Sequence, residues 1–143
     1  MLPLLLLLSG VAQAEDPPPD APSGVGLPAS QQKKLFKQWG CDADTTTVAL
    51  VGSEPVSGFE VTGWLVTGCG EPFVQTMNER RGQWTFGPDD RELRKRAPFD
   101  LSCGAADVTY TWISSTTRGA SGCGQQLTYI RIDQKWVANV AGR

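Results

Sequence analysis

The feature that most constrains how this chain can fold is a pattern of cysteines and strands that occurs twice. In each copy a cysteine is followed, at offsets of five, seven and nine residues, by side chains that suit one face of a β-strand. They are Thr46, Val48 and Leu50 after Cys41, and Val108, Tyr110 and Trp112 after Cys103. A Gly-Cys-Gly tripeptide then follows in both copies, centred on Cys69 and on Cys123. The pattern predicts two related β units.

The segments after each tripeptide also correspond. An apolar segment, a charged turn and a strand led by tryptophan follow in the same order, at residues 73–86 in the first copy and 127–140 in the second. The first copy has an additional segment, 52–63, before its tripeptide. We expect a mainly β fold with a minor helical part, made of two small antiparallel units of three or four short strands each. Units of about 40 residues rarely fold alone, so the two copies are expected to share one core.

The four cysteines are predicted to form two structural disulfides. Their spacings contain no Cys-x-x-Cys pair, which argues against zinc and thioredoxin-like sites. The flanking glycines allow a close backbone approach, and no basic neighbour stabilises a thiolate. Equivalent cysteines should occupy equivalent places, so the repeat favours the pairs Cys41–Cys69 and Cys103–Cys123. Joining like with like, Cys41 to Cys103 and Cys69 to Cys123, respects the same symmetry and remains the alternative.

The N-terminus has the pattern of a secretory signal peptide. A leucine-rich run at residues 2–8 is followed by Ala12-Gln13-Ala14, the small-x-small pattern that signal peptidase accepts before Glu15. A membrane-spanning helix needs about 20 apolar residues, which this run does not reach. We therefore expect residues 1–14 to be removed, and the mature chain, with no transmembrane segment, to be periplasmic, on the cell surface or secreted. Disulfides suit such an oxidising compartment.

Two helices and one tether are expected around the strands. Residues 15–29 contain five prolines and are predicted to be a disordered tether that packs no core. Ser30 is a candidate cap for a helix over 31–39 that ends at Gly40. The predicted first repeat, with this helix, therefore covers residues 30–87.

The charged segment 88–97 is expected to be a linker helix, capped by Asp89 or Asp90 and followed by the second repeat over 98–143. Its basic residues should lie towards the C-terminal end, where the helix dipole favours them. They form a possible basic patch for an acidic partner: Arg91, Arg94, Lys95 and Arg96. The neighbouring acidic residues offset much of this charge, which favours a solvated helix instead.

The composition excludes several classes of function. Thirteen basic and fifteen acidic side chains give a net charge of −2, whereas nucleic-acid binding calls for a basic surplus. Histidine is absent, which excludes Ser-His-Asp and Cys-His catalysis and metal sites built on histidine. No cofactor site, metal site or catalytic residue is predicted. The acids that could serve a carboxylate-dependent hydrolase lie near predicted turns: Asp42, Asp44, Glu60 and Glu71.

The second copy resembles a pattern found in small exported proteins and lipoproteins of Gram-negative bacteria. In that group an A-x-F-D-L-x-C segment, here Ala97 to Cys103, precedes a strand, a G-C-G, a tyrosine and a late tryptophan, here Tyr129 and Trp136. The resemblance covers about 97–140, with a weaker echo in 36–86. It departs at Ile130-Arg131, where the group often has a further cysteine. The resemblance implies export and a disulfide-bonded β module, and implies nothing about catalysis.

These observations predict an exported, non-enzymatic module of the envelope or the medium that binds a protein or glycan partner. Two alternatives stay open. One is an inhibitor or accessory protein of an exported enzyme, and the other is a hydrolase that uses paired carboxylates. A flat aromatic or basic face would favour binding, and a deep pocket with two close carboxylates would favour the enzyme.

Overall fold

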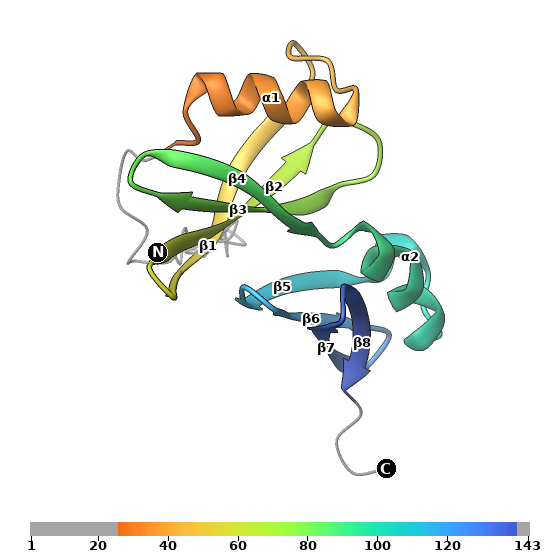
Figure 1. Ribbon diagram of the computed structural model, residues 1–143. Helices are drawn as coiled ribbons and strands as arrows, with labels where there is room; N and C mark the ends of the chain where they lie inside the picture. The colour runs from red at the N-terminus through yellow and green to blue at the C-terminus, as the bar shows by residue number, and fades with distance from the viewer. Residues whose placement is uncertain (1–25, 140–143) are drawn as a thin grey trace, which may run out of the picture.

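Two four-stranded antiparallel sheets form about half of the part of the chain that the structure describes, and in each the strands are neighbours in the order of the sequence (Figure 1). The computed structural model describes residues 26–139. The first unit (residues 26–89) contains α1 (Ala29–Trp39), β1 (Thr47–Val56), β2 (Phe59–Thr67), β3 (Phe73–Arg80) and β4 (Gln83–Asp89). The second unit (residues 90–139) contains α2 (Arg91–Asp100), the 3₁₀ helix η1 (Ala105–Asp107), β5 (Thr109–Ser114), β6 (Thr117–Gly122), β7 (Gln125–Ile132) and β8 (Lys135–Asn139). The predicted mainly β fold of two antiparallel units is confirmed.

Tight turns connect four of the strand pairs. Each has two central residues with positive φ, at Ser57-Gly58, Arg81-Gly82, Cys123-Gly124 and Asp133-Gln134. This backbone twist matches the right-handed twist of the paired strands, so such turns hold a hairpin in register. The additional segment 52–63 of the first copy is the far half of the long β1–β2 hairpin, which turns at Ser57-Gly58.

Helix α1 begins earlier than expected. Its first residue is Ala29 and Pro28 is at the N-cap, so the prediction that Ser30 caps the helix is wrong. The reason is that Leu27 is buried in the first core and its carbonyl accepts a hydrogen bond from Gln32 Nε2 at 2.8 Å. The end of the predicted tether therefore belongs to the first unit. The predicted signal peptide, its cleavage site at Ala14 and the rest of the tether lie outside the described residues.

Helix α2 lies three residues further along than the predicted linker helix. Asp89 remains in β4, where it pairs with Gln75 of β3, and its carboxylate accepts the backbone N–H of Arg91 at 3.0 Å. Asp90 is the N-cap residue, but its carboxylate accepts the backbone N–H of Val74 at 2.7 Å instead of capping the helix. The helix has no basic residue in its last turn, so the expected place of the cations relative to the helix dipole is wrong.

A proline inside α2 is accommodated by a side chain of the second sheet. Pro98 has no N–H, so the carbonyl of Arg94 receives no helical hydrogen bond from it. The hydroxyl of Tyr110 on β5 donates to that carbonyl at 3.3 Å. Burial raises the pKa of this phenol, which keeps it in the protonated form that donates.

The two units have separate hydrophobic cores, which corrects the expectation of a shared one. The first core contains Leu27, Leu35, Trp64, Val66, Phe73 and Met77. The second contains Leu93, Ala97, Leu101, Val108, Ala120, Tyr129 and Trp136. Helix α2 contributes Leu93 and Ala97 to the second core, and its C-cap residue contributes Leu101. It is therefore the second unit's own covering helix, as α1 is for the first. Each copy of the repeat thus buries the apolar face of its sheet with its own helix.

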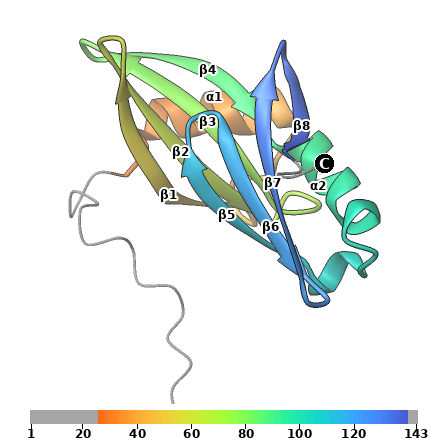
Figure 2. The same cartoon turned by 90° about the horizontal axis from the view of Figure 1, so that it is seen from below.

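The units meet where β5 lies beside β1 (Figure 2). The indole of Trp112 on β5 packs on Gly52 and Gly63, where a Cβ atom at either position would overlap the ring. Arg118 is 1% exposed, its guanidinium lies 3.9 Å from the centre of the Trp112 ring, and it donates to Thr76 Oγ1 of the first unit at 3.3 Å. Burial lowers the pKa of Arg118 to about 10. Glycine, indole and guanidinium therefore form a specific junction between the sheets.

Candidate functional site

An open groove of about 1000 Å³ lies between α2, the β2–β3 connection and the start of the second sheet. It is bordered by both units, since Phe73 belongs to the first core and Tyr110 packs against the second. The apolar part of its wall includes Pro72, Phe73, Pro98, Phe99, Val108 and Tyr110. Three of the four predicted basic residues line it as well, namely Arg91, Arg94 and Lys95.

Phe99 is the most exposed large apolar side chain of the described residues. It is 86% exposed, whereas the next, Ile113, is 54% exposed. Ala97 of α2 and Leu101 at its C-cap, on either side of Phe99, are fully buried. The helix therefore turns its alanine and leucine to the core and presents the phenylalanine at the rim of the groove.

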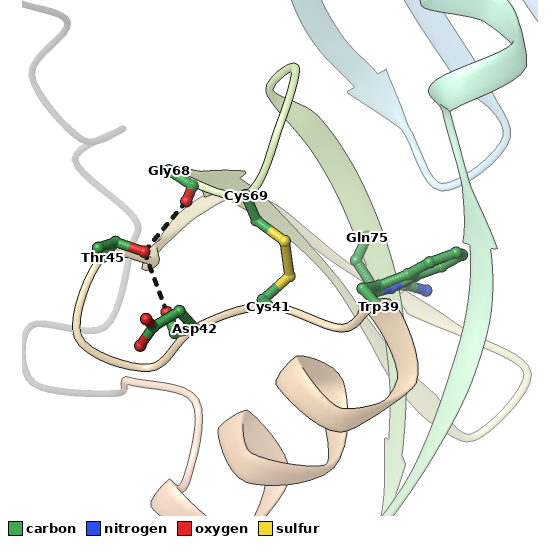
Figure 3. The surroundings of a disulfide bond; sticks show 7 residues. All are labelled: Trp39, Cys41, Asp42, Thr45, Gly68, Cys69 and Gln75. Atoms are coloured by element: carbon green, nitrogen blue, oxygen red, sulfur yellow. Dashed lines mark hydrogen bonds between the residues drawn. A yellow bond between two sulfur atoms is a disulfide. The ribbon is translucent and has the colours of Figure 1, made fainter.

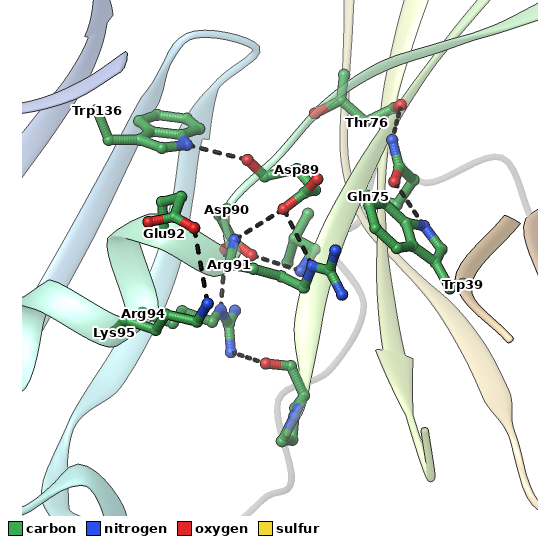
Figure 4. A network of polar contacts seen from close by, with 12 residues as sticks. Trp39, Gln75, Thr76, Asp89, Asp90, Arg91, Glu92, Arg94, Lys95 and Trp136 are labelled. Carbon is green, nitrogen blue, oxygen red and sulfur yellow. Dashed lines mark hydrogen bonds and ion pairs between the residues drawn. The ribbon is translucent and has the colours of Figure 1, made fainter. Parts of the chain in front are cut away.

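Arg91 is held in one orientation at the other end of the groove. Its guanidinium lies 3.6 Å from the centre of the Trp39 ring, and its Nε lies 3.5 Å from Asp89 Oδ1 (Figure 4). The indole is itself fixed, because Trp39 Nε1 donates to Gln75 Oε1 at 3.0 Å. Gln75 is 1% exposed and its amide donates to the carbonyl of Gly87 at 2.8 Å. Among residues 26–139 the two terminal nitrogens of Arg91 have no hydrogen-bond partner.

The remaining basic residues are occupied by contacts within the protein. Arg94 donates through Nε to the buried carboxylate of Asp90 at 2.9 Å. Arg96 lies on another side of α2, where it donates to the carbonyl of Trp136 at 2.9 Å. Each of the four basic residues has a carboxylate within 4 Å: Arg91 with Asp89, Arg94 with Asp90, Lys95 with Glu92, and Arg96 with Asp100. The predicted basic patch is thus divided between two sides of the helix and locally neutralised.

The four cysteines form the pairs Cys41–Cys69 and Cys103–Cys123, as the repeat predicted. Each bond joins the segment after a helix to a Gly-Cys-Gly tripeptide, as Figure 3 shows for the first unit. The tripeptide glycines allow close backbone contact, since a Cβ atom at Gly122 would lie 2.7 Å from the carbonyl oxygen of Asp107. Asp107 also lies near both sulfurs of the second pair, but bonded sulfurs offer no thiolate to a metal.

The structure separates one of the predicted acidic residues, Glu60, from another, Glu71. Asp42 accepts the backbone N–H of Asp44 at 2.9 Å, which is a local turn contact. Glu60, at the start of β2, accepts a hydrogen bond from the hydroxyl of Ser53. Glu71 lines the groove beyond the other end of β2. A strand of this length separates its two ends by more than about 20 Å, so Glu60 and Glu71 cannot act on one bond.

The sequence pointed to Arg91 by its charge but not to its partners. In the sequence, Trp39 was expected only as part of a helix, Gln75 only as part of a strand, and Phe99 only as part of a motif. The stacking of Trp39 on Arg91 joins residues that are far apart in the chain. A local pattern carries no signal for such a contact.

Comparisons with known proteins give no relative from which a function could be transferred. No protein-family model matches the sequence, and no curated protein or solved structure is significantly similar to it. The resemblance of residues 97–140 to small exported proteins therefore stays a prediction. Within residues 26–139, neither helix combines the length and the apolar character needed to cross a bilayer.

Proposed function

We propose that this protein is an exported, non-enzymatic module of the envelope or the medium, and that it binds a partner in the groove beside α2. The observation that carries the proposal is the groove itself, with a phenylalanine exposed at one end and a stacked, ordered arginine at the other. Large apolar side chains exposed beside charged ones are typical of interaction surfaces. Aromatic residues and arginine also carry most of the binding energy in such surfaces.

Three features support export. The N-terminal segment has the pattern of a signal peptide, the second copy resembles exported proteins, and both disulfides are of the kind that persists in oxidising compartments. N-terminal sequencing of the protein recovered from the periplasm or the medium tests this part. A chain beginning at Glu15 supports it, and a chain that keeps residue 1 contradicts it.

The alternatives differ in what they need from the structure. An inhibitor or accessory protein would use the same groove, with an exported enzyme as the partner. A hydrolase would need two acids close to one bond, and the separation of Glu60 from Glu71 does not favour it. The proposal therefore keeps binding as the function and leaves the partner's own activity to the experiment.

The test is affinity capture with the mature chain, residues 15–143, from periplasmic extract. A partner that occupies the groove should be retained by the wild type and reduced about tenfold or more by Phe99→Ala. This substitution removes an exposed side chain, so the fold should not change. Ile132→Ala is the matched control, because Ile132 is also exposed, at 52%, and does not line the groove. Equal retention by all three proteins would contradict the proposed site.

A further inference from the structure

We propose that the groove binds an extended peptide that carries a carboxylate side chain and, three to four residues away, a large apolar side chain. This inference rests on the proposed binding function and names the chemistry of the partner. It follows from two ends of the groove that differ in character. Arg91 is at one end and Phe99 with Pro98 is at the other.

The Arg91 end is suited to a carboxylate. Its Nε is directed to Asp89 and its plane is stacked on Trp39, so the edge that carries the terminal nitrogens is left for a ligand. A planar guanidinium matches a carboxylate through two parallel hydrogen bonds. Trp39 and Gln75 already hold the group in place, which lowers the entropy that binding must overcome.

The Phe99 end is suited to an apolar side chain. Pro98 and Phe99 border it from the helix, and Ala105 and Ala106 border it from η1. Phe99 is 86% exposed, so its ring has most of its surface available for a contact that removes it from water. The one residue of α2 after Phe99 is Asp100, whose carboxylate accepts a hydrogen bond from the hydroxyl of Tyr129.

The spacing of the two ends sets the spacing of the ligand groups. Arg91 and Phe99 are eight residues apart on one helix, which corresponds to about 12 Å along its axis. An extended peptide advances about 3.3 Å per residue, so three to four residues cover that distance. A carboxylate and a side chain three or four positions away from it therefore span the same length as Arg91 and Phe99 do along the helix axis.

A peptide fits the groove better than a sugar chain. Recognition of sugar hydroxyls needs several free donors and acceptors, whereas Arg94 is bonded to Asp90 and Asp89 is bonded to Arg91. Most of the rest of the wall is apolar, with Glu71 as its further charged residue. Lys95 and Glu92 form only an exposed pair, with side chains 74% and 83% exposed, so they can separate at little cost to make room for a chain.

The experiment uses fluorescence anisotropy of the mature chain with labelled peptides whose ends are blocked. Each peptide has a glycine-serine background with one Glu and one Phe, at every separation from one to about six residues. We expect the tightest binding at three to four. Arg91→Ala and Arg91→Lys should each weaken it about tenfold, the second because lysine keeps the charge but loses the planar pair of donors. Replacing the peptide's Glu by Gln should cause a similar loss.

The two losses should not add, because they remove the same contact. The controls Lys135→Ala and Ile132→Ala, which leave the groove unchanged, should bind within about twofold of the wild type. Circular dichroism and mapping of both disulfides establish that each variant is folded. A peptide in which Lys replaces Glu should bind Arg91→Glu better than it binds the wild type.

Other results overturn the inference in distinguishable ways. If the affinity does not depend on the Glu or on its distance from Phe, Arg91 does not bind the carboxylate of the peptide. Phe99-dependent binding, and with it the proposed function, would remain. Arg91-dependent binding of neutral or acidic oligosaccharides, with no peptide bound up to about 1 mM, would replace the peptide by a glycan. Absence of binding to both classes, together with no Phe99-dependent capture from extract, would overturn the proposed function as well.

Discussion

The two units of this protein share one backbone frame, which consists of a helix end, a disulfide and a four-stranded meander. They differ in the side chains that this frame carries on its surface. In both, the helix ends in a residue with positive φ directly before the cysteine, Gly40 before Cys41 and Ser102 before Cys103. In both, the N–H of that cysteine donates to the carbonyl five residues earlier, at 2.8 and 2.9 Å. The same helix end, disulfide and meander of four strands are therefore built twice. The repeat specifies the frame and leaves the surfaces free to differ.

The hydrogen bond that joins the helix to the sheet differs between the two units. Gln75 and Tyr129 both stand six residues after the tripeptide cysteine, and each bonds to the end of its unit's helix. In the first unit Trp39 donates to Gln75, and in the second unit Tyr129 donates to Asp100 at 2.7 Å. The first arrangement leaves an indole face available to Arg91, and the second ends in a carboxylate. The first unit thus supplies the indole of Trp39, on which Arg91 stacks, and the second unit supplies α2, which carries Arg91.

The β1–β2 hairpin provides a second difference. Its strands have ten and nine residues, against six and six for β5 and β6. The added length contains Gly52 and Gly63, the two positions on which Trp112 packs. The insertion that breaks the repeat is therefore the part that joins the units.

Removing the disulfides should have the largest effect on this comparison. The two loops span 28 and 20 residues, so the chain-entropy model assigns each bond about 3 kcal/mol. We expect the Cys41→Ala/Cys69→Ala and Cys103→Ala/Cys123→Ala double variants to lose similar amounts of free energy of unfolding, measured in urea. Non-reducing peptide mapping of the wild type is the control. A cross-link from Cys41 to Cys103 or Cys123 would contradict the two-unit fold.

Much of this frame could be predicted from the sequence, because it depends on short-range signals. Alternating apolar residues predicted β1 and β5, and equivalent cysteines predicted the pairing. The positions of the helices were harder to predict from the sequence. Asp89 stays in β4 because it pairs with Gln75, and α1 starts early because Leu27 reaches the first core. Both shifts depend on contacts with the folded sheet, which no window of local sequence contains.

Only part of the candidate site could be predicted from the sequence. A run of charge marked Arg91, yet charge alone also marked Arg96, which the fold directs to the second sheet. What separates these two arginines is the stacking on Trp39, which depends on how the units are joined. The sequence therefore predicted the basic residues that line the groove and not the groove itself.

Gly63→Ala tests whether the long hairpin joins the units. The added Cβ would overlap the indole of Trp112, so we expect a loss of about 1 to 3 kcal/mol, as for other overpacked sites. The loss should shrink in a Trp112→Ala background, because the two changes share one contact. Gly26→Ala is the control, since a Cβ there has nothing within 4 Å, and it should change the free energy by less than about 0.5 kcal/mol.

Tyr129→Phe tests the hydrogen bond between helix and sheet in the second unit, which Tyr129 donates to Asp100. We expect a loss of about 1 to 2 kcal/mol at neutral pH, because Asp100 loses a charge-assisted hydrogen bond. Burial, followed by the bond to Asp100, raises the pKa of Tyr129 above the usual 10.0. The unfolded chain therefore releases this proton at lower pH than the folded protein. The contribution should be complete below pH 10 and decline above it, and Tyr129→Phe should lack that decline. An unchanged pH profile would assign the decline to another group.

The smallest expected effect comes from exchanging the equivalent residues Gly40 and Ser102 between the two units. The residue before the cysteine has φ of 66° at Gly40 and 49° at Ser102, a region that disfavours side chains and favours glycine. Ser102→Gly should therefore raise the free energy of unfolding by about 0.5 to 1 kcal/mol, and Gly40→Ser should lower it by a similar amount. The double exchange should be close to neutral, because the two sites lie in different units and share no partner. Urea unfolding of the four proteins measures all three changes. A loss of stability on Ser102→Gly would mean that the serine is selected for a contact of its own, and that the two helix ends are not equivalent.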